Sequence, residues 1–171
     1  MKSVCWFRND LRVLDNPALH HCCNNSDEVI AVYFINRAQW QEHDDALIKI
    51  NFWLRNLESL QNKLEKLNIP LVVLEADNYS DTASVLKDFC IKNEAKNLYF
   101  NNEYPINELE RDRNIYSSFK EDGIGVFTYH DQVIHEPGSL KTTTGNNFSV
   151  YSPFKRKWFA ELTDDQLVIL D

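Results

Sequence analysis

Short apolar segments recur along the chain at intervals of about 25 to 40 residues, and stretches of helical character separate them. Each segment is rich in β-branched or aromatic residues and too short to form a helix, which favours buried strands. The five segments are residues 4–7, 28–35, 70–75, 97–101 and 125–129. Strands that alternate with helices in this way need right-handed crossovers, so the sequence predicts a parallel sheet covered by helices on both faces.

The predicted fold class is therefore α/β, with a doubly wound sheet of five parallel strands. By analogy with Rossmann-like and flavodoxin-like sheets, we expect the strand order 3-2-1-4-5. The longest helix is expected from Leu47 to Leu67, where leucine and isoleucine recur every three or four residues and form one apolar stripe. We expect residues 36–45, which precede this helix, to form a loop at the carboxyl edge of the sheet.

Capping residues mark the starts of the shorter helices. Asp15 or Asn16 is expected to cap the first helix, and Ser80 the helix that follows the third strand. After residue 130 the regular alternation stops, and Ser152 is expected to cap a last helix with Pro153 in its first turn. We expect that helix to pack on the sheet through its apolar side chains, which are Phe154, Trp158 and Leu162.

The chain has 171 residues, with 18 basic and 26 acidic side chains and a net charge of -8. This length suits a single domain, and the negative charge disfavours direct binding of nucleic acid, which relies on Lys and Arg. No apolar run reaches the length of a membrane span, and the first residues lead into a strand without the apolar core of a signal peptide. We therefore expect a cytoplasmic protein with no membrane partner.

The cysteines, Cys5, Cys22, Cys23 and Cys90, lack the spacing of a zinc site, and Cys5 and Cys90 fall in apolar faces. We therefore expect a reducing compartment and free thiols that are buried at Cys5 and Cys90. Adjacent residues on a helix point about 100 degrees apart, so the His-His-Cys-Cys run at residues 20–23 does not predict a metal site. The chain has four glycines and neither a G-x-G-x-x-G nor a P-loop fingerprint, which argues against ordinary dinucleotide or triphosphate binding. We predict neither metal ligands nor catalytic residues in this chain.

The stretch from residue 6 to residue 19 reads Trp-Phe-Arg-x-Asp-Leu-Arg-x-x-Asp-Asn-x-Ala-Leu and spans a strand end, a charged loop and a helix start. It resembles the amino-terminal signature of the DNA photolyase and cryptochrome family. Residues 152–158, Ser-Pro-Phe-x-x-x-Trp, resemble the segment that closes the first domain of the same family. Within the charged loop we expect Arg8, Asp10 and Arg12 to form a structural ion-pair cluster rather than a catalytic group.

Residues 104–112, Tyr-x-x-Asn-Glu-x-x-Arg-Asp, resemble the segment that offers side chains to the pterin in photolyases with a folate antenna. The resemblance implies that Asn107 and Glu108 bind this folate and that His43, which matches a histidine of the same group, faces it. A carboxylate beside a carboxamide can accept from and donate to an aminopyrimidinone edge. In the alternative, Asn107 caps the helix and Glu108 favours its positive end. We interpret Arg111 and Asp112 as a pair on the helix surface, because adjacent residues do not face one another.

The resemblance covers residues 1–162 and implies the light-harvesting antenna domain of a class I bacterial deoxyribodipyrimidine photolyase, with residues 163–171 starting an interdomain linker. The implied antenna cofactor is methenyltetrahydrofolate. In this family a larger carboxyl-terminal helical domain, which has no counterpart here, binds FAD and damaged DNA and uses light to split pyrimidine dimers. The implied partners are the antenna chromophore, that helical domain and, through the full-length protein only, DNA. The chain alone is expected to be inactive in repair.

Two other functions stay open. A cryptochrome-type blue-light sensor has the same first domain, and a stand-alone nucleotide-binding domain would share the α/β architecture. The identity of the antenna is open as well, since deazaflavin and flavin antennae occur in relatives.

Overall fold

Five parallel strands form one sheet in the computed structural model, which describes all residues from 1 to 171. The strands are β1 (Lys2–Phe7), β2 (Glu28–Ile35), β3 (Leu71–Glu75), β4 (Asn97–Asn101) and β5 (Gly125–Tyr129). Their order across the sheet is β3-β2-β1-β4-β5, and every neighbouring pair is parallel. The predicted α/β class and strand order are therefore confirmed.

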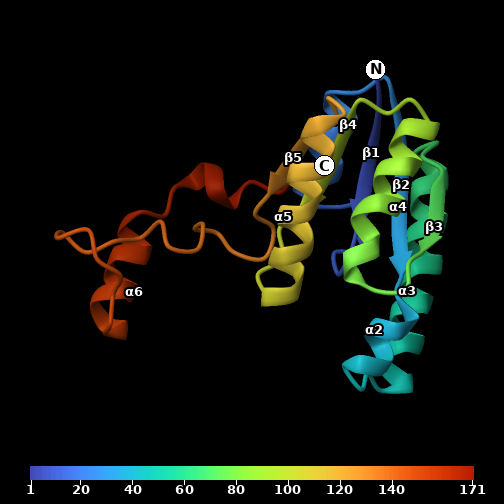
Figure 1. Ribbon diagram of the computed structural model, residues 1–171. Coiled ribbons are helices and arrows are strands. Elements are labelled where there is room, and N and C mark those ends of the chain that lie inside the picture. The colour runs from blue at the N-terminus through green and yellow to red at the C-terminus, as the bar shows by residue number, and fades with distance from the viewer.

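Helices connect the strands and cover both faces of the sheet (Figure 1). Two helices, α1 (Pro17–Asn24) and α3 (Leu47–Lys66), pack on one face, and α4 (Tyr79–Lys92) and α5 (Ile106–Glu121) pack on the other. The remaining elements are α2 (Arg37–Glu42), α6 (Tyr151–Ala160) and a short 3-10 helix, Asp164–Leu167. In Figure 1 the strands run towards α2, so α2 lies at the carboxyl edge of the sheet.

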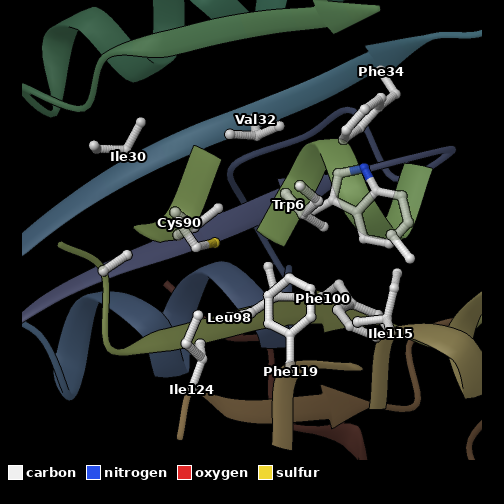
Figure 2. Packing of buried hydrophobic residues seen from close by; sticks show 14 of the residues in the cluster. Trp6, Ile30, Val32, Phe34, Cys90, Leu98, Phe100, Ile115, Phe119 and Ile124 are labelled. Atoms are coloured by element: carbon white, nitrogen blue, oxygen red, sulfur yellow. The ribbon is translucent and has the colours of Figure 1, made fainter. Parts of the chain in front are cut away.

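Alternate residues of β1 belong to two different cores, because successive side chains of a strand point to opposite faces. Val4 and Trp6 pack with residues of α4 and α5, whereas Cys5 packs with residues of α1 and α3. Figure 2 shows the first core, in which the Trp6 ring centroid lies 5.8 Å from that of Phe34 and 5.4 Å from that of Phe100. The central strand is thus covered on both sides, as expected for a parallel sheet.

The caps of two helices fix where the loops at the carboxyl edge end. Asn16 caps α1 as predicted, and its side-chain oxygen accepts from the backbone N–H of Leu19 at 3.1 Å. The prediction of Ser80 as the cap of α4 is wrong, because the helix begins one residue earlier. Asn78 holds that position, and its side-chain oxygen accepts from the backbone N–H of Asp81 at 3.1 Å.

The segment between β2 and β3 departs from the prediction in two ways. Residues 36–45 are not only a loop, because they contain the short helix α2. The apolar stripe of α3 is buried at Leu57, Leu60 and Leu64, but Leu47 is 78% exposed and Leu54 is 39% exposed. The first half of α3 extends past the carboxyl edge of the sheet and has no strand to cover (Figure 1).

The last helix, α6, does not pack on the sheet, contrary to the prediction. Figure 1 shows it on an extended segment away from the strands, and none of its residues is buried. It begins one residue before Ser152, which is therefore not its cap. Phe154 instead packs against Phe148, and Trp158 against His135. The faces of the sheet are already covered by four other helices, which leaves no apolar strand surface for α6.

After α6 the chain returns to the sheet domain. The backbone N–H of Asp15, in the loop after β1, donates to the carbonyl oxygen of Leu170 at 2.7 Å. Residues 163–171, predicted as the start of a linker, therefore contact the loop that precedes α1.

The cysteines are all free, and Cys5 and Cys90 are buried as predicted, together with Cys22. None of the helices combines the length and the hydropathy that crossing a bilayer would require.

Candidate functional site

A cleft of about 160 Å³ lies at the carboxyl edge of the sheet. The ends of β1 and β2 and the loop after β4 form its floor, and α2, the first half of α3 and the starts of α4 and α5 form its walls. Its lining includes Trp6, Arg8, Tyr33, Gln39, Trp40, His43, Asp45, Lys49, Trp53, Tyr79, Glu103, Glu108 and Arg111. Open α/β sheets usually bind ligands at this edge.

A buried charge cluster of Arg8, Glu103, Arg111 and Asp112 forms and supports the floor of the cleft. Nη1 of Arg8 donates to both carboxylate oxygens of Asp112 at 2.9 Å. Nη2 of Arg111 donates to Glu103 at 2.9 Å, and its Nε donates to Asp112 at 3.0 Å. Two positive and two negative groups compensate one another, and buried charges need such compensation.

Arg111 and Asp112 are therefore not the surface pair that the sequence suggested. Both lie on the buried face of α5, with Ile115 one turn further on. Their partner Arg8 follows β1, about a hundred residues earlier in the chain, so only the folded sheet brings the opposite charges together.

Aromatic rings enclose both guanidinium groups of the buried charge cluster. Cζ of Arg8 lies 4.9 Å from the ring centre of Trp6 and 4.7 Å from that of Phe100. Cζ of Arg111 lies 4.7 Å from the Trp6 ring centre and 4.9 Å from that of Tyr79. The Trp6 indole thus contacts two cations, and cation–π contacts of this kind contribute about 0.5–2 kcal/mol each.

The same charges shift the pKa of Glu103. Burial alone would raise it, but the guanidinium groups of Arg8 and Arg111 outweigh burial and hold the pKa below its ordinary value of 4.5. The side-chain amide of Asn9 also donates to this carboxylate. Glu103 is therefore ionised at neutral pH and remains a partner of both arginines.

The side chains of Arg8, Asp10 and Arg12, which were predicted to pair with one another, bond to different partners. Asp10 accepts from the backbone N–H of Arg8 at 2.8 Å and from the side chain of Asn101 at 2.6 Å, and burial raises its pKa. Arg12 donates to Asp131, which follows β5. Arg8 belongs to the buried charge cluster and is the member of the three that lines the cleft.

Glu108 and His43, which the sequence suggested as chromophore contacts, both line the cleft. Glu108 lies in the first turn of α5, and its Oε1 accepts from the hydroxyl of Tyr79 at 3.4 Å. Burial and the charge of Glu108 raise the pKa of Tyr79 to about 12, so its hydroxyl keeps the proton that it donates. His43 follows the last residue of α2, and its ring is hydrogen-bonded to the side chain of Gln39.

Asn107 lies outside this cleft. It is exposed and lines a neighbouring open hollow that shares Tyr79 with the cleft wall. The alternative in which Asn107 caps α5 is wrong, because the helix begins one residue earlier, at Ile106. The structure thus brings Glu108 and His43 to one cleft and places Asn107 beside it.

The outer wall of the cleft contains residues that the sequence did not indicate as a site. Trp40 of α2 and Trp53 of α3 have ring centres 6.3 Å apart, with their planes at 30°. Nζ of Lys49 lies 4.6 Å from the Trp53 ring centre and donates to Asp45 at 2.5 Å. The spacing of four residues between Lys49 and Trp53 is the available signal, since such residues share one side of a helix. Asp45 lies two residues before that helix begins.

Aromatic walls beside a half-buried carboxylate suit a planar ring that carries N–H donors. The indole rings offer flat apolar faces, and Glu108 can accept hydrogen bonds from such a ring. The cleft, at about 160 Å³, is smaller than the roughly 300–1,000 Å³ of pockets that enclose a drug-sized ligand. It can therefore hold the ring end of a larger ligand and leave the rest outside.

A sequence profile described as DNA photolyase matches residues 3–168. The chain belongs to the DNA photolyase family. It is 36% identical over 157 residues to the deoxyribodipyrimidine photo-lyase of Buchnera aphidicola subsp. Acyrthosiphon pisum, and the aligned region covers 91% of this chain and 32% of that protein. It is 31% identical over 162 residues to the Escherichia coli K12 deoxyribodipyrimidine photo-lyase, and the aligned region covers 94% of this chain and 34% of that protein. The chain thus spans about a third of the length of these photolyase-family relatives.

Solved structures of the family share the fold. A bacterial class III photolyase from Agrobacterium tumefaciens matches with a TM-score of 0.77 at 27% identity, over 99% of this chain and 33% of that chain. A Synechocystis cryptochrome matches with a TM-score of 0.81 at 23% identity, over 94% of this chain and 33% of that chain, and this likeness concerns the fold alone. The profile match confirms the family resemblance, and the solved structures agree with it in fold.

Proposed function

We propose that this chain is the light-harvesting antenna domain of a deoxyribodipyrimidine photo-lyase and that its cleft binds methenyltetrahydrofolate. The observation that carries the proposal is that Glu108 and His43 face one aromatic-lined cleft at the carboxyl edge of the sheet. Tyr79 holds one oxygen of the Glu108 carboxylate, and the remaining lone pairs can accept from the N–H groups of an aminopyrimidinone ring. Membership of the photolyase family supports this reading.

The residues of the cleft fit the ring end of such a chromophore. When bound, the folate supplies absorption of blue or near-ultraviolet light. Glu108 would set the orientation of the ring, His43 would contact it from α2, and the indole of Trp40 would keep water from its face. Asn107 would contact the ligand at the rim, because the hollow that it lines shares Tyr79 with the cleft.

In the full-length protein, a carboxyl-terminal helical domain would bind FAD and damaged DNA and would complete the cleft. Two observations support this division: the chain spans about a third of its relatives, and its net charge of -8 is unfavourable for phosphate binding. Residues 1–162 would then be the antenna domain, and residues 163–171 the start of the linker. The chain alone would have no lyase activity and would bind its chromophore weakly, since affinity falls when a pocket lacks one wall. Its free thiols suit the reducing cytoplasm.

A fluorescence titration of the chain with methenyltetrahydrofolate tests the proposal. We expect saturable binding by the wild type and binding at least about tenfold weaker by Glu108→Ala, because the ligand loses a hydrogen bond to a charged group. Glu121→Ala is the matched control, since it removes an exposed carboxylate from the opposite end of the same helix. This control should bind like the wild type.

Equal affinities of the wild type and Glu108→Ala would remove Glu108 from the site. Absence of saturable binding by the wild type, or tighter binding of a flavin or a deazaflavin, would contradict the folate antenna. These outcomes differ from one another, so the titration separates an error about the residue from an error about the chromophore.

A further inference from the structure

The first half of α3 has a role that its packing on the sheet does not explain. Burial of the helix against the sheet begins at Leu57, and the earlier turns extend beyond the strands beside α2 (Figure 1). Lys49 and Trp53 lie on one side of this overhang, four residues apart, and Asp45 lies two residues before the helix begins. All three line the cleft. The overhang therefore forms the outer wall of the cleft.

Lys49 is the accessible cation of this cleft. The other cationic side chains in the lining, Arg8 and Arg111, are 5% and 4% exposed and are bonded to the carboxylates of the buried charge cluster. The Lys49 side chain is 53% exposed. An anionic group on a ligand in the cleft can therefore reach Lys49 without breaking the buried charge cluster.

The neighbours of Lys49 hold its ammonium group over an aromatic surface. Asp45 accepts one of its hydrogen bonds, and the ring of Trp53 lies 4.6 Å from Nζ. An ammonium group has three N–H donors, so two remain for a ligand. Trp40, 6.3 Å from Trp53 between ring centres, extends the aromatic surface towards α2.

We propose that Lys49, Trp53 and Trp40 form an outer subsite for the tail of the folate, with Lys49 binding the glutamyl carboxylates and the indoles contacting the aminobenzoyl ring. This inference rests on the proposed function, because it assumes that the ring end of a folate lies at Glu108. The cleft accommodates only part of such a ligand, and the tail would leave it along the wall where the cation and the indoles are.

The test compares two ligands, methenyltetrahydrofolate and its diamide, in which both glutamyl carboxylates are carboxamides. Lys49→Met keeps the apolar stem and removes the charge, and it should weaken binding of the acid by about fivefold while leaving binding of the diamide unchanged. Lys49→Arg should restore most of the affinity for the acid. Added salt should weaken binding of the acid by the wild type more than by Lys49→Met.

Two further variants complete the design. Lys63→Met removes an exposed lysine from the last turns of the same helix, away from the cleft, and should bind both ligands like the wild type. Trp53→Leu should weaken binding of both ligands by about twofold to tenfold, because it removes an aromatic contact from acid and diamide alike.

Equal losses for the acid and the diamide in Lys49→Met would show that Lys49 only supports the wall, and would overturn the subsite. Unchanged binding of the acid would overturn it as well. Either result is compatible with a folate bound at Glu108, whereas absence of binding by the wild type would overturn the proposed function itself.

Discussion

At the floor of the cleft, Arg8 compensates the negative charges of two buried carboxylates, Asp112 and Glu103. It donates to both oxygens of Asp112 at 2.9 Å and lies 3.6 Å from Glu103, and all three side chains are at most 9% exposed. An ion pair in this setting contributes little net stability when complete, but removing one partner leaves an uncompensated charge in the interior.

We expect Arg8→Met to lower the free energy of unfolding by about 3–5 kcal/mol, because it leaves Asp112 and Glu103 with too little positive charge. The matched control is Arg37→Met, which removes an arginine from an exposed pair with Glu75 and should change stability by less than about 1 kcal/mol. Urea denaturation measures both. A loss for Arg8→Met no larger than that of the control would contradict a buried cluster.

The lowered pKa of Glu103 predicts how the stability of the protein depends on pH. Its folded-state pKa lies below the ordinary value of 4.5, so its contribution is present above that value and is lost as the pH falls through the folded pKa. Glu103→Gln cannot titrate, and its stability should fall less steeply than that of the wild type between about pH 5 and pH 3. Burial raises the pKa of Asp10, so Asp10 favours the folded state as the pH falls, opposite to Glu103. Both proteins contain Asp10, so its contribution cancels when their stability curves are compared.

Urea unfolding at several pH values is the measurement for this pair of proteins. Parallel stability curves for the wild type and Glu103→Gln would mean that Glu103 has the same pKa in the folded and unfolded chain.

The residues of the cluster could be read from the sequence only in part. Arg8 belongs to a recognisable sequence motif, whereas the helical pattern alone places Arg111 and Asp112 on the helix surface. A helical pattern shows which residues share a face, but it cannot show that charges from a distant loop will compensate a buried pair. The same limit applies to Lys49 and Trp53, because their importance depends on α3 extending past the sheet.

At the scale of elements, α3 combines two functions along one helix. Its second half covers the sheet through Leu57, Leu60 and Leu64, and its first half forms the wall of the cleft. The division between the two halves lies where the strands end (Figure 1).

Two equivalent substitutions test this division. Leu60 is 1% exposed, so Leu60→Ala should lower the free energy of unfolding by about 2–5 kcal/mol through lost burial and an unfilled cavity. Leu54 is 39% exposed, so Leu54→Ala should lower it by less than about 1 kcal/mol. Similar losses in a urea unfolding experiment would show that the first half of α3 is packed as tightly as the second.

The strands were predictable within a few residues because each is a buried apolar run bounded by polar residues. The bounds of β2, β4 and β5 agree with the predicted segments 28–35, 97–101 and 125–129. The strand order needed the analogy with doubly wound sheets, since periodicity does not determine which strands are neighbours. Short helices such as α2 were missed because six residues give too few turns for a periodic pattern.

At the scale of the whole molecule, the sheet domain buries its apolar side chains, whereas α6 leaves several of its own exposed. Both faces of the sheet are covered, whereas α6 and the residues before it extend from the domain and expose Tyr151 and Phe159. The prediction for α6 was wrong because an amphipathic pattern shows that a helix has an apolar face, but it does not show which surface that face contacts. The cleft lies near the start of α5, at the carboxyl edge of the sheet.

A crystal structure of the chain soaked with methenyltetrahydrofolate tests the central claim most directly, because it locates the chromophore without assuming a site. We predict that the ring end lies in the cleft with an N–H group about 2.7–3.2 Å from the Glu108 carboxylate. The tail should run along the outer wall towards Lys49. Density for the chromophore elsewhere on the surface, or a ring in the cleft that does not contact Glu108, would contradict the account.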